Sequence, residues 1–227
     1  MEHRFLTRSE ASITAAGHIS AAITRRLETH ARTAIAVSGG TTPAACYRAL
    51  SKAGVEWPRV DVVLSDERWV PADHADSNEW LVRNTLLTNK AVKARLIATY
   101  DGLATVETRC MEFEAALREL AQPFACSLLG MGIDGHFASL FPDAGNLAEG
   151  LREQGERLCL PIETAASPYL RVSLTLAALA RSDEIILLFF GEDKRKVLDT
   201  ALNSDSRLPV CRLLTQNCAP VHVYWAP

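Results

Sequence analysis

Short apolar runs alternate along the chain with longer stretches of helical character. The strand-like runs fall near residues 33–37, 60–64, 125–129, 184–190 and 220–225, and the helical stretches fall near 9–31, 43–53, 77–88, 105–120 and 192–202. The run from Glu184 to Phe190 is apolar without alternation after its first residue, as expected for a strand buried on both faces. This order predicts an α/β fold with an open, mostly parallel, Rossmann-like sheet and helices on both of its faces.

The length of the chain, 227 residues, suits one α/β domain with a large core. No internal repeat, low-complexity tract or linker divides it, so we expect a single domain over residues 1–227. The segment 143–170, which holds several Gly and Glu residues, is expected to form a long surface excursion. We expect a monomer or, at most, a weak homodimer.

The charge and the apolar pattern exclude several classes of protein. A net charge of −3 without any block of Lys or Arg argues against nucleic-acid binding. No apolar run approaches the roughly 18 residues of a transmembrane helix, and the N-terminus has no apolar signal core. We therefore expect a cytoplasmic protein without a membrane partner. With this net charge, any anionic ligand would have to be held by local positive groups.

The cysteines predict neither disulfides nor a metal site. No C-x-x-C motif occurs, and no His, Cys and carboxylate residues share a zinc-like spacing in the sequence. The six cysteines are interpreted as small buried residues of a protein from a reducing compartment. They are Cys46, Cys110, Cys126, Cys159, Cys211 and Cys218.

The most informative segment is 129–142, which reads L-G-M-G-I-D-G-H-F-A-S-L-F-P. It follows a strand-like run, and its glycines expose backbone N–H groups where no side chain blocks a ligand. Asp134 and His136 lie in this opening, and an imidazole there can act as a general base near neutral pH. Taken alone, the segment is also compatible with a glycine-rich turn whose histidine only binds a loop.

A second glycine loop, S-G-G-T-T-P at 38–43, lies between a strand-like run and a helical stretch. The N–H groups of Gly39 and Gly40 and the hydroxyls of Thr41 and Thr42 can surround a phosphate. The loop has neither the Walker pattern nor G-x-G-x-x-G, so no nucleotide cofactor is implied. An ordinary strand-to-helix turn remains the alternative.

A third candidate loop begins where the strand-like run 60–64 ends in the charged residues Asp66, Glu67 and Arg68. Side chains just beyond the carboxyl ends of parallel strands line the ligand crevice of such sheets. Arg68 could clamp a phosphate or carboxylate, and Asp66 could bind sugar hydroxyls or steer the imidazole. His74, a few residues later, is interpreted as a surface or supporting residue.

Together these loops resemble those of the 6-phosphogluconolactonase family, in the family's order and spacing. The matching segments are S-G-G-T-T-P (38–43), S-D-E-R-W-V-P with H-A-D-S-N (65–78), the segment 129–142, R-V-S-L-T (171–175) and G-E-D-K (191–194). The resemblance covers nearly the whole chain. It implies hydrolysis of 6-phospho-D-glucono-1,5-lactone to 6-phosphogluconate, in the oxidative pentose phosphate pathway, without a cofactor.

This substrate needs a base, oxyanion donors and a grip on the phosphate, because a δ-lactone is an activated ester. We expect His136 to be the base, oriented by Asp134 or Asp66, between which the sequence does not choose. The N–H groups of residues 132–136 are candidate oxyanion donors. No G-x-S-x-G elbow occurs, and no metal is expected in the site. The expected phosphate ligands are Gly39, Gly40, Thr41, Thr42, Arg68 and, through the resemblance, Arg171 and Lys194.

Two related classes of protein share features with this chain. Glucosamine-6-phosphate deaminases have a similar loop and a G-x-D-G-H element, but their pattern continues as A-F-N-E-P, whereas this chain continues as A-S-L-F-P and lacks the acidic residue. Sugar-phosphate-sensing domains of transcription regulators carry a helix-turn-helix in front. Only about 30 residues, not basic, precede the first core strand here, too few for such a module.

Overall fold

The apolar runs of the sequence form one central sheet in the computed structural model, which describes residues 1–202 and 206–227. Each strand is parallel to its neighbours, which confirms the predicted open parallel sheet. In spatial order the strands are β1 (Glu2–Arg4), β10 (Val221–Ala226), β9 (Ile185–Phe190), β6 (Cys126–Leu129), β2 (Thr33–Val37), β3 (Val60–Leu64) and β5 (Arg95–Ile97).

The five predicted helical stretches are helices, and each is shorter than the stretch that predicted it. Hydroxyl side chains set the first residue of three of them, because Thr7, Ser77 and Thr105 accept a hydrogen bond from a backbone N–H of the first turn. The helices are α1 (Arg8–Leu27), α2 (Ala44–Leu50), α3 (Asn78–Thr85), α4 (Val106–Glu119), α5 (Leu147–Gly150), α6 (Leu176–Leu179), α7 (Glu192–Ala201) and α8 (Pro209–Thr215), with single 3₁₀ turns η1 (Trp57–Arg59) and η2 (Asn89–Lys93).

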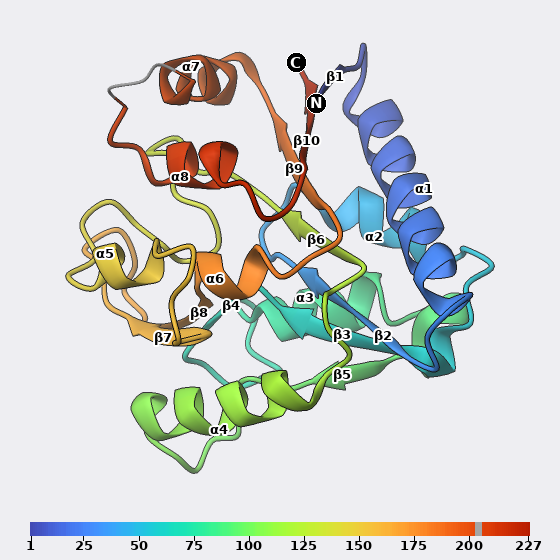
Figure 1. Cartoon of the computed structure of the whole chain (residues 1–227), viewed down its shortest axis with the longest axis horizontal. Helices are drawn as coiled ribbons and strands as arrows, with labels where there is room; N and C mark the ends of the chain where they lie inside the picture. The colour runs from blue at the N-terminus through green and yellow to red at the C-terminus, as the bar shows by residue number, and fades with distance from the viewer. Residues whose placement is uncertain (203–205) are drawn as a thin grey trace.

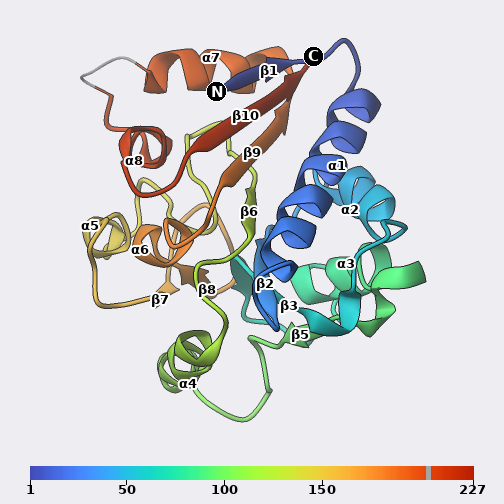
Figure 2. The same ribbon diagram turned by 45° about the vertical axis from the view of Figure 1, so that its right-hand side comes forward.

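The sheet separates two apolar cores, and successive residues of its strands point into opposite ones. In β9, Leu187 lies in the core shared with α4, α6, α7 and α8, and its neighbour Leu188 lies in the core shared with α1, α2 and α3. Figure 2 shows α1, α2 and α3 on one side of the sheet and the remaining helices on the other. A strand buried on both faces must be apolar throughout, which explains the unbroken run in β9.

A second, three-stranded antiparallel sheet was not predicted. Its order is β4 (Asp66–Arg68), β8 (Arg171–Leu174), β7 (Cys159–Ile162). The prediction of a surface excursion over 143–170 is therefore wrong for β7, where Leu160 and Ile162 are buried in the core. The charged residues 66–68 likewise form a strand, and not a solvated turn. Pairing of β4 with β8 brings Asp66 opposite Ser173 and Arg68 opposite Arg171.

The direction in which the chain adds strands reverses between β2 and β6. From β2 it proceeds outward through β3 to β5, and it then returns to place β6 on the other side of β2 (Figure 1). In parallel sheets such a reversal opens a crevice at the carboxyl ends of the two strands, because their following loops leave in opposite directions. The loops after β2 and β6 are the two glycine loops of the sequence, so the fold places them side by side.

Two further features of the described residues bear on the sequence expectations. None of their helices combines the length and the apolar character needed to cross a membrane. All six cysteines are free thiols, and Cys46, Cys110, Cys126 and Cys159 are buried, as expected. The interpretation of all six as buried residues is wrong for Cys218, which is exposed, and for Cys211, which is half-buried.

Leu187→Ala should lower the free energy of unfolding by about 2–5 kcal/mol, because Leu187 is fully buried at the centre of the sheet. Leu6→Ala is the matched control: its side chain is 88% exposed, and its removal should change the free energy by less than about 0.5 kcal/mol. Urea unfolding measures both, and equal effects would contradict the position of β9 in the core.

Candidate active site

The loops that follow β2, β3, β6 and β9 surround one open cleft of about 240 Å³ at the carboxyl edge of the main sheet. Nine of the ten site residues expected from the sequence line it, and the tenth, Asp134, contacts His136. The lining residues are Ser38, Gly39, Gly40, Thr41, Thr42, Asp66, Arg68, Asn78, Gly130, Met131, Gly132, His136, Ala138, Arg171 and Lys194.

The imidazole of His136 is held by Asp134, with 2.6 Å between Nδ1 and the carboxylate Oδ1. Of the two carboxylates that the sequence left open, Asp134 therefore contacts the imidazole. This pair requires glycine at position 132: a Cβ there would lie 2.3 Å from the imidazole and 2.5 Å from the Asp134 carboxylate. The glycine thus allows both side chains to approach the backbone at the end of β6.

The hydrogen bond between Asp134 and His136 determines which ring nitrogen of His136 carries the lone pair. Burial alone would raise the pKa of the Asp134 carboxyl, but its hydrogen bond to His136 and the charge of the imidazole outweigh this and hold that pKa below its ordinary value. An ionised Asp134 accepts a hydrogen bond from Nδ1–H of the neutral ring, so the lone pair of the imidazole lies on Nε2. The ring packs on Phe141 at 4.1 Å between centroids, which limits its rotation.

Most of the N–H groups proposed as oxyanion donors are already engaged within the loop. Gly132 donates to the His136 carbonyl at 2.9 Å, and Gly135 donates to the Gly132 carbonyl at 3.1 Å. The N–H of His136 faces Asp134 Oδ1 at 3.2 Å. The expectation that residues 132–136 supply the oxyanion donors is therefore wrong for these three groups. The sequence could not show that the loop satisfies its own backbone.

Asp66 joins two other segments of the cleft. Its buried carboxylate oxygen Oδ2 accepts from Arg171 Nη2 at 3.0 Å and from the Ser139 hydroxyl at 2.6 Å. Arg171 Nε also donates to that hydroxyl at 2.6 Å. Burial would raise the pKa of the Asp66 carboxyl, but Arg171, Ser139 and Arg68 together lower it below its ordinary value. Asp66 is thus an ionised partner of Arg171, and it makes no hydrogen bond to His136 among the described residues.

Arg68 is positioned from the N-terminus of α3. Its Nη1 donates to the Asn78 side-chain oxygen at 2.5 Å and to the Asp76 carbonyl at 3.0 Å. The buried Glu67 carboxylate accepts four hydrogen bonds, including those from the backbone N–H groups of Arg68, Asn78 and Glu79. This carboxylate therefore caps the N-terminus of α3 and joins β4, which carries Arg68, to that helix.

The loop 38–43 is open to a ligand. The backbone N–H groups of residues 39–42 donate to no acceptor among the described residues, and Thr41 is exposed. Gly39 is required here, because a Cβ would lie 1.8 Å from the Asn78 side-chain oxygen. Unused N–H groups that converge on a cleft are what a phosphate binds.

Lys194, in the first turn of α7, completes the group of cations in the cleft with Arg68 and Arg171. Its burial lowers the pKa of its ammonium group, and the nearby charge of Asp134 partly offsets this. The Lys194 side chain forms no salt bridge or hydrogen bond within the part of the chain that the structure describes. Its charge is therefore available to an anionic ligand, whereas that of Arg171 is partly neutralised by Asp66.

Sequence reasoning missed Asn78 and Ser139 as parts of the site. Both lie inside segments that resemble the family, so a signal was present, but each has an ordinary identity for its local position. Asn78 begins a helix, and Ser139 follows a turn-forming loop. Their role comes from contacts with Arg68 and Asp66 across the fold, which no local pattern encodes.

Comparison with known proteins agrees with this geometry. A family model described as "Glucosamine-6-phosphate isomerases/6-phosphogluconolactonase" matches residues 7–225. The chain belongs to this family. The 6-phosphogluconolactonase of Mesorhizobium japonicum is 40% identical over 98% of this chain and 94% of its own length. The 6-phosphogluconolactonase of Caulobacter vibrioides is 41% identical over 98% of this chain and 95% of its own length.

Solved structures show the same fold. A 6-phosphogluconolactonase from Shewanella baltica superposes with a TM-score of 0.96 at 33% identity, over 100% of this chain and 97% of that one. A monomeric glucosamine-6-phosphate deaminase superposes with a TM-score of 0.76 at 17% identity, over 98% and 96%, which shows the shared fold alone. The predictions of the family, of the α/β fold and of an enzyme of the 6-phosphogluconolactonase class are confirmed.

Asp66→Asn should lower the free energy of unfolding by about 3–5 kcal/mol at pH 7, because it leaves the Arg171 charge buried without a partner. The folded-state pKa of Asp66 lies below the value of about 3.9 in an unfolded chain. The ionised pair therefore stabilises the fold fully above about pH 5, and this contribution is lost as the pH falls through the folded-state pKa.

Urea unfolding between pH 7 and pH 3 measures the free energy of unfolding of wild type and of Asp66→Asn. The difference between the two free energies should become smaller as the pH falls. Asp193→Asn, at a side chain that is 88% exposed, is the control and should change little. A gap that stays constant down to pH 3 would mean that Asp66 is not an ionised partner of Arg171.

Proposed function

We propose that this protein hydrolyses 6-phospho-D-glucono-1,5-lactone to 6-phospho-D-gluconate, with His136 as the general base and without a metal in the reaction. The observation that carries the proposal is the His136–Asp134 pair facing a cleft that also contains three cationic side chains. A base and an anion-binding group in one cleft are what hydrolysis of a phosphorylated lactone requires. The names of the relatives support the same substrate.

In the proposed reaction, His136 Nε2 takes a proton from a water molecule that attacks the lactone carbonyl carbon. Asp134 on Nδ1 keeps the imidazole in the tautomer with a free Nε2 and stabilises the imidazolium that forms. The tetrahedral intermediate then collapses with cleavage of the ring C–O bond, and the imidazolium returns its proton to the departing ring oxygen. The ester carbonyl is already activated, so neither a covalent nucleophile nor a Lewis acid is needed.

The phosphate is proposed to bind between the loop 39–42 and the cations Arg68 and Lys194. The free N–H groups of the loop and the unpaired ammonium of Lys194 support this assignment. Arg171 faces the same cleft, but its guanidinium already donates to Asp66 and Ser139. Arg171 therefore has fewer N–H groups left for the phosphate, and it also stabilises the fold. Asp66 is proposed to position Arg171 and not to act on the substrate.

The deaminase reaction is not favoured by this site. In the segment A-S-L-F-P, Phe141 stands where the deaminase pattern A-F-N-E-P has its acidic residue. The Phe141 ring packs against His136 and is buried, so it leaves an apolar wall beside the imidazole where the isomerisation would need a carboxylate.

His136→Asn should lower kcat for the lactone by about 10²–10⁴-fold, the usual contribution of a positioned base. The lactone is generated in situ with a glucose-6-phosphate dehydrogenase, and its loss is followed by NMR after subtraction of spontaneous hydrolysis. His74→Asn is the control, since His74 is an exposed histidine that does not line the cleft. Near wild-type turnover in His136→Asn would overturn the proposed mechanism.

Lys194→Ala should reduce kcat/KM for the phosphorylated lactone by about 10- to 150-fold, because a charged hydrogen bond contributes about 1.5–3 kcal/mol. Against unphosphorylated gluconolactone the same variant should lose almost nothing, since the group that Lys194 binds is missing. Lys196→Ala, two residues away and 77% exposed, should leave both substrates unaffected. Equal losses on both substrates would place Lys194 in the catalytic centre or the fold and remove it from the phosphate site.

A further inference from the structure

A second group of convergent side chains lies at the opposite edge of the main sheet from the cleft. His18 comes from the middle of α1, Glu184 directly precedes β9, and His222 is the second residue of β10. The cleft begins where β9 ends, and the strand separates the two places by about 20 Å. None of the three residues has a part in the proposed reaction.

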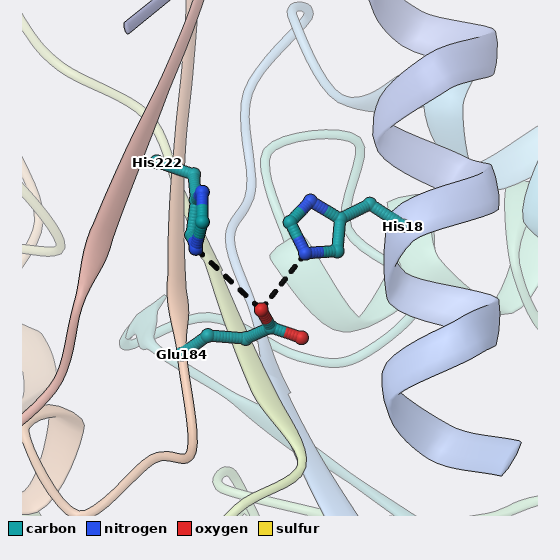
Figure 3. A group of neighbouring side chains, drawn as sticks. All are labelled: His18, Glu184 and His222. Carbon is teal, nitrogen blue, oxygen red and sulfur yellow. Dashed lines mark hydrogen bonds and ion pairs between the residues drawn. The ribbon is translucent and has the colours of Figure 1, made fainter. Parts of the chain in front are cut away.

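The three side chains point at one another (Figure 3). Glu184 Oε2 lies 2.8 Å from His18 Nε2 and 3.6 Å from His222 Nε2, and all three atoms lie within 4.8 Å of one another. In a tetrahedral zinc site with bonds of about 2.0–2.1 Å, neighbouring ligand atoms are about 3.3 Å apart. The two measured distances bracket that value, so small side-chain movements are enough to admit an ion.

His18 Nε2 and Glu184 Oε2 are hydrogen-bonded to each other at 2.8 Å, so a zinc ion would take the place of the proton between them. Arg25 Nη2 donates to the other oxygen of Glu184, Oε1, at 2.9 Å and so orients Oε2 toward the two histidines. His18 Nδ1 lies 2.7 Å from the Tyr224 hydroxyl, whose oxygen can accept a hydrogen bond from Nδ1–H, so that the lone pair of the ring lies on Nε2. His222 Nδ1 has no hydrogen-bond partner among the described residues, so nothing there commits the imidazole proton to Nε2.

We propose that His18, Glu184 and His222 form a binding site for one zinc ion, which joins α1 to the amino ends of β9 and β10. Two imidazoles and one carboxylate are a common ligand set for this ion, and water would supply the fourth ligand. Side-chain exposures of 22% for His18 and 16% for His222 give the ion a route from solvent.

The site was not expected from the sequence, because its ligands have no local spacing. The positive charges nearby, on Arg25 and the N-terminal amine, weaken the site and favour moderate over very tight binding.

The test is a titration of chelator-treated protein with Zn²⁺, with binding measured by isothermal titration calorimetry. Wild type should bind one ion per chain, and His222→Gln and Glu184→Gln should bind at least about 100-fold more weakly. His30→Gln is the matched control, because His30 is an exposed histidine just beyond α1 and outside the cluster. Saturating zinc, about 100 times Kd, should raise the Tm of wild type by about 5–10 °C and leave the Tm of His222→Gln unchanged.

Three results would overturn the proposal: no zinc uptake by wild type, unchanged affinity in His222→Gln, or loss of the ion in His136→Ala, which would place it in the cleft. If Glu184→Gln fails to fold, His222→Gln alone decides the test. The 3.6 Å contact between His222 and Glu184 is longer than the 2.8 Å contact between His18 and Glu184, so its loss should disturb the fold least. Activity toward the lactone should be the same in zinc-free wild type and in His222→Gln. That readout separates the zinc site from the proposed reaction.

Discussion

The geometry of the cleft depends on the buried carboxylate of Asp66. It lies directly beyond β3, and through one oxygen it binds Arg171 on β8 and Ser139 in the loop that follows the imidazole. These contacts tie two strands of the small antiparallel sheet to each other and to the loop that follows β6. A buried charge is tolerated only when it is paired and hydrogen-bonded, so the three segments must come together for any of them to be stable.

The neighbouring carboxylate, Glu67, performs the same task on the other side of the cleft. It caps α3 and places Asn78 where it binds Arg68 and packs against Gly39. Two adjacent acidic residues thus organise two different walls. The groups proposed to face the ligand, by contrast, are those without a hydrogen-bond partner among the described residues: the N–H groups of the loop 39–42, the ammonium of Lys194 and Nε2 of His136.

The two edges of the main sheet carry different chemistry. The carboxyl edge gathers the glycine loops because the strand order reverses between β2 and β6. The amino edge gathers His18, Glu184 and His222 because α1 crosses the starts of β9 and β10. A cation bound at the amino edge would stabilise the packing of α1 without touching the cleft, so the two sites can be studied independently.

Much of this fold could be predicted from local patterns. The strand-like runs 33–37 and 60–64 are strands with those bounds, because an unbroken apolar run flanked by turn residues suits a buried parallel strand. The helices were predicted too long at one or both ends, since frayed polar residues continue the helical pattern beyond the last hydrogen-bonded turn. The strand β7 was missed because its segment is rich in Gly and Glu, and only pairing with β8 makes it a strand.

The sequence by itself determined the order of the elements, the glycine loops and the identity of the groups that reach the cleft. These features depend on residue type and on spacing along the chain, from which local backbone preferences and burial patterns can be predicted. The tertiary structure decided which of them touch: that Asp134 and not Asp66 binds His136, that three N–H groups of the loop 132–136 are already hydrogen-bonded, and that His18 lies close to His222. Such contacts join residues far apart in the chain, and their geometry follows from the packing of whole strands and helices.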